Sequence, residues 1–184
     1  MTTSEEAKRY PIEPLDPERH DRAAFSCGNT QVDNFFRRTA NKLAKADNVR
    51  TFVMVGLKGQ VIGFYATSAH AADYTELPER FARNRPAQGS IPAAYISMIG
   101  VDSRFQGHGY SGDMLVDCLK RLAGAADALG IAVVMLDVLD CGSPEEVAKR
   151  LALYTSYGFA PLPSNGFRLL LPIATVRALT QTGA

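Results

Sequence analysis

The sequence predicts a mixed α/β fold, and three observations lead to this class. Two apolar stretches at 51–57 and 61–68 flank a short glycine-containing turn, which is typical of an antiparallel hairpin. A strand-like stretch at 93–101, a long helical pattern and a buried apolar run at 131–138 then follow in the order of a βαβ unit. The length of 184 residues suits one domain, which we expect to span 1–184.

Composition excludes several classes of protein. Hydrophobic residues make up 46% of the chain and charged residues 21%, which excludes global disorder, collagen and coiled coil. Lys and Arg number 20 against 19 Asp and Glu, so the formal net charge is +1. A protein that binds nucleic acid through overall basic charge is therefore excluded, whereas a local basic patch is not.

Targeting and metal signals are absent from the sequence. The N-terminal stretch MTTSEEAKRY lacks the apolar core of a secretion signal, and the longest apolar run, 131–136, is far shorter than the ~18 residues that span a bilayer. Cys27, Cys118 and Cys141 have neither disulfide-framework nor zinc-site spacing, and the three histidines are scattered. We expect a cytoplasmic protein with no membrane segment and no bound metal.

The first elements are expected to be a short strand at 12–15 and a helix that opens at Asp16–Pro17. An aspartate followed by proline suits an N-cap and a first helical position. This helix is expected to end before the break at Cys27–Gly28–Asn29.

A second helix is predicted over 30–46. Val32, Phe36 and Leu43 fall on one face at helical spacing, which indicates the buried side. The opposite face is basic and carries Arg38, Lys42 and Lys45, with Arg37 flanking them.

The central elements follow the same reasoning. Lys58–Gly59 closes the hairpin, and the polar, proline-interrupted stretch 73–89 predicts a loop with about one helical turn. The strand at 93–101 leads through a glycine-rich turn into a helix over 109–129. The apolar side of that helix consists of Met114, Leu115, Cys118, Leu119 and Leu122.

The last elements begin with the buried strand at 131–138. Ser143 then opens a helix, because it is an N-cap followed by proline and two glutamates. This helix is expected to end at Gly158, before two strands near 159–162 and 167–171.

The glycine-rich turn Gln106-Gly107-His108-Gly109-Tyr110-Ser111-Gly112 lies between a strand and a helix. Glycines permit positive φ, so backbone N–H groups and the helix N-terminus can together hold a pyrophosphate without a lysine. A plain strand-to-helix turn is the alternative. The turn is neither a Walker A loop nor a first-unit Rossmann fingerprint, because no Gly-Lys-Ser/Thr follows and it comes after a hairpin.

A second segment, Leu153-Tyr154-Thr155-Ser156-Tyr157-Gly158-Phe159, closes a helix with aromatic residues. Its ordinary interpretation is a packed helix C-cap, with Tyr154 in the core. Both segments together, in this order, resemble the GCN5-related N-acetyltransferase family over roughly 10–172. That family has a loop Gln/Arg-x-x-Gly-x-Gly/Ala and a later segment Phe/Leu-Tyr-x-x-x-Gly-Phe. The matching residues are Gln106, Gly109, Ser111, Leu153, Tyr154, Gly158 and Phe159.

The front half shows a narrower resemblance. The stretches Arg22–Asn29, Val32–Arg38, Arg50–Val53 and Gly63–Ala69 are similar to the acetyltransferase toxins of type II toxin–antitoxin pairs. This resemblance implies a mostly antiparallel sheet that splays at an acetyl-CoA site between flanking helices. It also implies acetylation of the amino acid on charged tRNA, a ribbon-helix-helix antitoxin and a homodimer.

The chain departs from the toxin pattern in three places. The strand before the loop reads Ser97–Asp102, without the arginine that is common there. The segment between Val138 and Tyr154 is longer than usual and contains Cys141–Gly142, and Arg150 stands where a small residue is common.

By this resemblance, acetyl-CoA lies between the strands at 96–101 and 131–138, and Tyr154 protonates the departing thiolate. A phenol of pKa about 10 donating toward a thiol of pKa about 8.5 costs roughly 2 kcal/mol. No general base is evident, which favours an α-amine, because its pKa of about 7.7–8.0 leaves part of it neutral at pH 7. The expected acetyl-CoA contacts are Ile99, Gly100, Val101, Gln106, Gly107, His108, Gly109, Tyr110, Ser111 and Gly112.

The expected tRNA contact is the basic helix face with the arginine beyond it: Arg37, Arg38, Lys42, Lys45 and Arg50. An ordinary solvated helix face is the alternative interpretation. Two other functions also stay open. One is acetylation of a small amine or a protein N-terminus. The other is a binding role without catalysis, as an acetyl-CoA sensor or as a partner in a DNA-repressor complex.

Overall fold

A computed structural model describes residues 10–87 and 89–181. The stretch 1–9, where we expect no secretion signal, lies outside the described residues, as do 88 and 182–184. No helix in the described ranges is long and apolar enough to cross a membrane.

The described residues form a seven-stranded mixed sheet in the order β1-β2-β3-β4-β5-β7-β6. Every neighbouring pair is antiparallel except β4 and β5, which are parallel. The predicted mixed α/β, mostly antiparallel class is therefore confirmed. The strands are β1 (Ile12–Pro14), β2 (Arg50–Val55), β3 (Val61–Asp73), β4 (Ser90–Val101), β5 (Val133–Asp137), β6 (Ala160–Leu162) and β7 (Asn165–Pro172).

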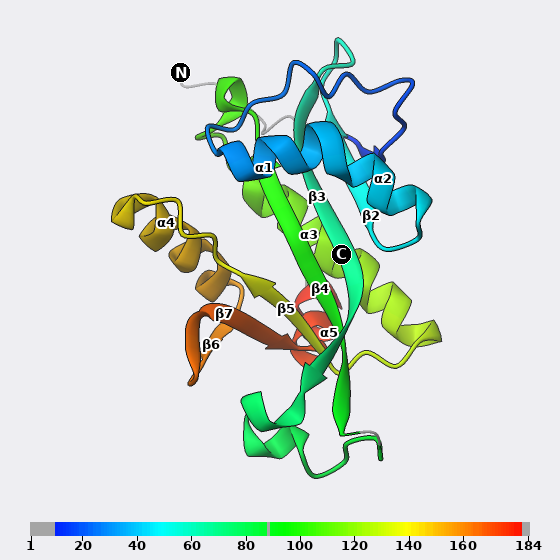
Figure 1. The fold of residues 1–184 in the computed structure, drawn as a ribbon, viewed down its shortest axis with the longest axis vertical. Helices are drawn as coiled ribbons and strands as arrows, with labels where there is room; N and C mark the ends of the chain where they lie inside the picture. The colour runs from blue at the N-terminus through cyan, green and yellow to red at the C-terminus, as the bar shows by residue number, and fades with distance from the viewer. Residues whose placement is uncertain (1–9, 88, 182–184) are drawn as a thin grey trace, which may run out of the picture.

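Helices flank both faces of the sheet (Figure 1). α3 (Tyr110–Ala128) and α5 (Ile173–Gln181) lie behind it in this view, whereas α1 (Thr30–Asn34) and α2 (Ala40–Lys45) cross the front. α4 (Pro144–Ser156) lies beside the end of β5. The main core packs the sheet against α3, and a separate aromatic core packs it against α1. Each helix therefore buries one apolar stripe on the sheet.

The sheet opens between β4 and β5. Their pairing begins at Ala93 opposite Val133 and ends at Ile96 opposite Leu136, although β4 continues to Val101. β4 remains paired with β3 along this length, and a register shift between Ala66 and Thr67 leaves Ser97 of β4 without a partner on β3. β5 remains paired with β7 instead. One edge of β4 beyond Ile96 therefore has no neighbouring strand.

The long β3 and β4 strands extend below the sheet as an arm (Figure 1). Two 3-10 turns, Tyr74–Glu76 and Glu79–Phe81, lie in the segment between them. The sequence predicts a loop with about one helical turn there. The loop is confirmed, and it contains two helical turns instead of one.

The predicted helix at Asp16–Pro17 is wrong, because the described chain makes a single turn there. The amide of His20 donates to the Asp16 carbonyl at 2.9 Å, as a helix would require. His20 is, however, 4% exposed, and its ring contacts the Asp16 amide and the Glu13 carboxylate at 2.9 and 2.8 Å. These contacts fix His20 against β1 and end the turn.

The helix predicted over 30–46 forms, but it is not uniform. A π-helical segment, Phe35–Thr39, separates α1 from α2. The wider π turn rotates the residues that follow it. As a result Ala40 is buried, whereas Leu43, which was expected in the core, is half-buried. The helix α5 was not predicted, and its buried contact is Val176.

Candidate active site

The glycine-rich turn forms a backbone cradle at the start of α3. Gly107 and Gly109 have φ of 82° and 83°, in the left-handed region that favours glycine. Among the described residues, the backbone amides from Gly107 to Ser111 donate to no protein acceptor. Together with the positive end of the α3 dipole, these amides form an anion-binding geometry.

Gln106 ties the cradle to the rest of the protein. Its side-chain amide donates to the carbonyls of Val101 and Cys27, at 2.9 Å each. It thereby joins the end of β4 to the segment before α1.

A groove of about 630 Å³ runs from the cradle along the open edge of β4 to α4. Tyr154 lines this groove, and so do most of the predicted cofactor-binding residues. The predicted cofactor-binding residues in the lining are Ile99, Gly100, Val101, Gln106, Gly107, Gly109, Tyr110 and Ser111. The structure therefore brings together two sequence segments about fifty residues apart.

Two predicted residues of the loop lie outside the groove lining. His108 faces back onto the turn, where its Nδ1 is 2.9 Å from the Gln106 carbonyl and its ring stacks on Tyr110. Gly112 lies where α3 approaches the end of α4, because an added Cβ would come within 3.0 Å of the Tyr157 hydroxyl oxygen. Its small size serves this close approach.

Sequence reasoning did not place several groove residues. Cys27, Gly28, Asn29 and Val32 reach the groove from the front half of the chain. They lie in the stretches that carry the toxin resemblance, which did not place them at the groove. Ser143, Glu146, Lys149 and Arg150 come from the start and one face of α4. Arg150, Glu146 and Ser143 precede Tyr154 by four, eight and eleven residues, and this helical spacing was the available signal for that face.

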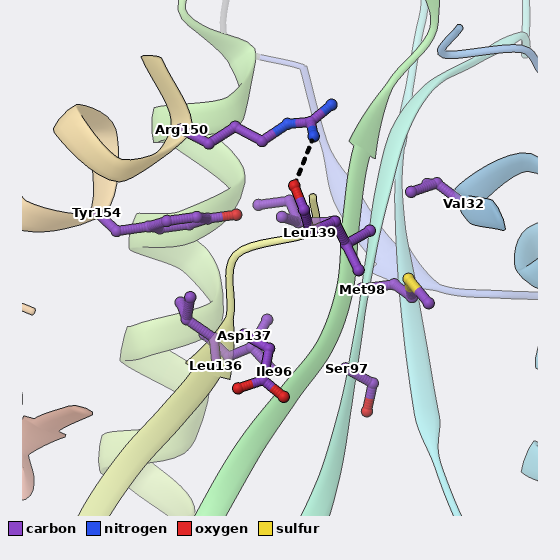
Figure 2. Close-up of a pocket in the computed structure, with 10 residues that line it drawn as sticks. Val32, Ile96, Ser97, Met98, Leu136, Asp137, Leu139, Arg150 and Tyr154 are labelled. Carbon is purple, nitrogen blue, oxygen red and sulfur yellow. Dashed lines mark hydrogen bonds between the residues drawn. The ribbon is translucent and has the colours of Figure 1, made fainter. Parts of the chain in front are cut away.

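Where β4 and β5 separate, the groove continues into a small cavity of about 30 Å³ (Figure 2). Val32, Ile99, Arg150 and Tyr154 line both spaces. The other lining residues are Ile96, Ser97, Met98, Leu136, Asp137 and Leu139. At about 10–15 Å³ for each water, the cavity has room for one or two small groups.

Tyr154 closes one side of this cavity. Its side chain is 5% exposed and packs edge-on against Phe159, with ring centroids 6.1 Å apart. Figure 2 shows the hydroxyl pointing into the cavity. Burial raises the pKa of the phenol to about 12, and the nearby Arg150 guanidinium opposes this rise. The hydroxyl is therefore a proton donor that stays protonated at any physiological pH.

Arg150, which departs from the family pattern, lies above the cavity in Figure 2. Its Nη1 is 3.4 Å from the Leu139 carbonyl oxygen, a long contact that leaves much of the guanidinium free to bind other groups. With Lys149 it gives the α4 side of the groove a positive charge, although Lys149 is also paired with Glu146 at 2.9 Å.

Cys27 lines the groove but is not an activated nucleophile. Burial raises the pKa of its thiol to about 11, so the thiol is protonated near neutral pH. Within the described ranges, no three His, Cys, Asp or Glu side chains are grouped so that they could hold a metal ion.

The basic residues of the second helix lie away from the groove, and they differ from one another in their contacts. Arg37 is half-buried and donates from Nε to the Phe25 carbonyl at 2.8 Å, so it helps to hold the local structure. Arg50 pairs with Asp47 at 2.7 Å. Arg50 is also close to the strand opening, because it lies opposite Thr67, which lies opposite Ile96. Arg38, Lys42 and Lys45 are exposed.

Comparisons with known proteins agree with this geometry. No protein-family model matches the chain. The chain is 63% identical over 180 residues to the probable toxin TacT of Sinorhizobium fredii (strain NBRC 101917 / NGR234), covering 97% of this chain and 99% of that protein. It is 29% identical over 159 residues to a tRNA-acetylating toxin of Mycobacterium tuberculosis (strain ATCC 25618 / H37Rv), covering 86% and 90%.

Solved structures share the fold. A tyrosine-to-phenylalanine mutant of KacT superposes with a TM-score of 0.81 at 20% identity, covering 94% of this chain and 99% of that one. AtaT complexed with acetyl-methionyl-tRNAfMet superposes with a TM-score of 0.78 at 21% identity, covering 92% and 98%. The backbone cradle, the open edge of β4 and the 63% identity to TacT lead to one conclusion. The chain belongs to the TacT family, the GCN5-related N-acetyltransferase toxins of toxin–antitoxin systems.

Proposed function

We propose that this protein transfers the acetyl group of acetyl-CoA to the α-amino group of aminoacyl-tRNA and so blocks translation. The observation that carries the proposal is one continuous path. The path begins at the free amides of the Gly107–Ser111 turn, follows the open edge of β4 and ends at the Tyr154 hydroxyl. The M. tuberculosis relative is named a tRNA-acetylating toxin, and AtaT is solved with acetyl-CoA and with an acetylated aminoacyl-tRNA.

The groove residues suit the three parts of acetyl-CoA. The amides of the Gly107–Ser111 turn would hold the pyrophosphate, with Lys149 and Arg150 supplying positive charge from the other wall. The free edge of β4 from Ile99 to Val101 would pair with the amide groups of the pantetheine arm. The acetyl end would then reach the cavity where Tyr154 lies.

In the proposed reaction, the neutral amine attacks the thioester carbonyl and forms the carbon–nitrogen bond. The carbon–sulfur bond then breaks, and Tyr154 donates its proton to the departing sulfur. The nitrogen loses one proton to water as the amide forms, and the phenolate of Tyr154 takes a proton back from water. The buried phenol is a weaker acid than the sequence alone suggested, because its pKa is about 12 instead of about 10. Against a thiol of pKa about 8.5, the cost of transfer becomes roughly 5 kcal/mol. Burial also raises the pKa of a thiol in the same cavity, which reduces this cost.

The acetylation itself is tested by incubating the protein with labelled acetyl-CoA and total tRNA charged by its cognate synthetases. We expect label on the aminoacyl ends of one or a few tRNAs and none on deacylated tRNA. Label on a small amine or a peptide instead, with every charged tRNA unlabelled, would contradict the proposal. Binding of acetyl-CoA without transfer to any acceptor would favour the sensor alternative.

The family also suggests partners and a compartment. We infer a ribbon-helix-helix antitoxin, a homodimer and a cytoplasmic location, where charged tRNA is found. AtaT has been solved with the C-terminus of the antitoxin AtaR, and a KacTA complex has been solved with DNA. Co-expression with the product of a neighbouring ribbon-helix-helix gene, followed by sizing of the complex, tests the first two inferences together.

Alanine at Gly107 or Gly109 is expected to weaken acetyl-CoA binding about fivefold to thirtyfold. An added Cβ meets nothing within 4 Å at either position, so the effect comes from the positive φ, which costs roughly 1–2 kcal/mol in a residue with a side chain. Titration calorimetry with acetyl-CoA measures this effect. Gly124 is the matched control, because its Cβ would also meet open space but its position is inside α3. Gly124→Ala should leave affinity unchanged, and equal affinity in all three variants would refute the cradle.

A further inference from the structure

The small cavity contains a carboxylate that the proposed chemistry does not use. Asp137 is the last residue of β5, one position beyond the final pair with β4, and it lines the cavity together with Ser97. Figure 2 shows both side chains at the end of the cavity away from Arg150. The Asp137 side chain is 31% exposed, so a ligand outside the core can reach it.

Two neighbouring strands hold this carboxylate in a fixed orientation. Arg168 of β7 donates from Nε to Oδ1 at 2.8 Å and from Nη2 to Oδ2 at 2.9 Å. The Tyr95 hydroxyl of β4 donates to Oδ2 at 2.8 Å. The bidentate Arg168 pair keeps the pKa of Asp137 below its ordinary value, so the group is ionised throughout the neutral range.

The hydrogen-bond count leaves one acceptor position free. An ionised carboxylate has about four lone-pair sites, and the three donors use one on Oδ1 and two on Oδ2. The remaining site is on Oδ1, on a side chain that lines the cavity. The Asp137 carboxylate, held by three hydrogen bonds and with one lone-pair site unused, therefore lines the same cavity as Tyr154.

Asp137 is partly exposed on the face of the sheet that also carries Tyr95 and Arg168. Tyr95 packs with the cluster around Met135, which contains no residue of α3. An acceptor can therefore reach the exposed part of this carboxylate, while the acetyl donor would lie along the groove.

We propose that Asp137 accepts a hydrogen bond from the α-amino group of the acceptor and aims its lone pair at the thioester carbonyl. This inference rests on the proposed function. It assigns the acceptor end of the site to Asp137, with Arg168 and Tyr95 as the residues that position it. The cavity volume of about 30 Å³ suits a group as small as an amine.

The Arg168 ion pair determines whether Asp137 stabilises the ammonium form or the neutral form of the amine. An isolated carboxylate would stabilise the ammonium form of the amine, which cannot attack. Arg168 offsets that charge, so the pair accepts a hydrogen bond from the neutral amine without holding a proton on it. The other ionisable groups nearby are Glu76, whose carboxylate is 4.0 Å from Arg168, and His70, whose ring lies 5.4 Å from that of Tyr95.

Binding without acetyl-CoA separates this role from catalysis. The probe is the charged tRNA that is labelled best in the acetylation assay, compared with the same tRNA after deacylation. Wild-type protein should bind the charged form more tightly. Asp137→Asn should weaken binding of the charged tRNA about tenfold, the loss of one hydrogen bond to a charged group, and leave binding of the deacylated form unchanged. Asp127→Asn, which removes an exposed carboxylate on α3, is the control and should change neither.

A second variant gives a different readout if Asp137→Asn is poorly folded. Arg168→Gln leaves Asp137 uncompensated, so the bound amine should lose its proton at a higher pH. The acid limb of the kcat profile should then move up by about one pH unit. The inference is overturned if Asp137→Asn still distinguishes charged from deacylated tRNA, or if Arg168→Gln leaves the acid limb in place. If wild-type protein acetylates no charged tRNA, the proposed function itself fails, which is a separate result.

Discussion

Replacing Tyr154 by phenylalanine is expected to lower kcat about 10²-fold to 10⁴-fold, the usual contribution of a positioned general acid. The change removes only the hydroxyl, and the ring still fills the space against Phe159, so the fold and acetyl-CoA affinity should be preserved. Initial rates with charged tRNA and titration of acetyl-CoA measure the two quantities separately.

The pH dependence gives an independent check on Tyr154. Because burial raises the pKa of the phenol to about 12, it remains protonated up to at least pH 10. The rate should therefore rise as the α-amine loses its proton, near or below pH 8, and then stay level to pH 10. A fall in rate between pH 8 and 10 that occurs in the wild type but not in Tyr154→Phe would contradict this expectation. It would mean that the phenol has a lower pKa and is more exposed to solvent than the structure shows.

A matched tyrosine is available as the control. Tyr157 lies at the end of the same helix, is half-buried and does not line the small cavity. Tyr157→Phe should keep nearly full activity. Equal rates for Tyr154→Phe and the wild type would remove the general-acid role.

Reversing charge at Arg38 and Lys42 together, with Arg38→Glu and Lys42→Glu, is expected to raise KM for charged tRNA at least about tenfold. Both side chains are exposed on the helical segment that ends beside Arg50, close to the opening of the sheet. Each lost phosphate contact should also reduce the slope of log affinity against log salt by roughly 0.7–0.9. Acetyl-CoA affinity should not change, because neither residue lines the groove.

The control for this prediction carries the same change in net charge elsewhere. Lys58, in the β2–β3 turn, and Lys120, on α3, are exposed and lie outside the groove. Lys58→Glu with Lys120→Glu should leave KM and its salt dependence near wild type. If both double variants behave alike, tRNA responds only to net charge and the basic helix face is an ordinary solvated surface.

Most elements of the fold could be read from local sequence. The Lys58–Gly59 hairpin, the helix N-cap at Ser143 and the apolar stripe of α3 are signals carried by residues within a few positions of one another. The errors have tertiary causes. Asp16 begins a turn, but His20 is held by Glu13 of another element and the turn does not become a helix.

Long-range contacts complete the candidate site. Gln106 reaches the carbonyl of Cys27, 79 positions earlier, and closes the groove with a segment that the toxin resemblance covers but does not place at the acetyl-CoA site. The charges around the cavity were also unforeseen. In the sequence Arg150 is only a departure from the family pattern, and Asp137 is only a residue of a predicted buried strand.

By itself the sequence determined the family, the mixed α/β class and the loop and tyrosine that the proposal uses, despite a formal net charge of only +1. Glycines, caps and hydrophobic periods act on neighbouring residues, so these features can be read along the chain. Only the tertiary structure decided where β4 leaves β5, after Ile96 and Leu136, and which side chains meet in the opening. Strand separation depends on competition among β3, β5 and β7 for the same edges. The partners in that competition are far apart in the sequence, so their pairing is settled only when the sheet packs.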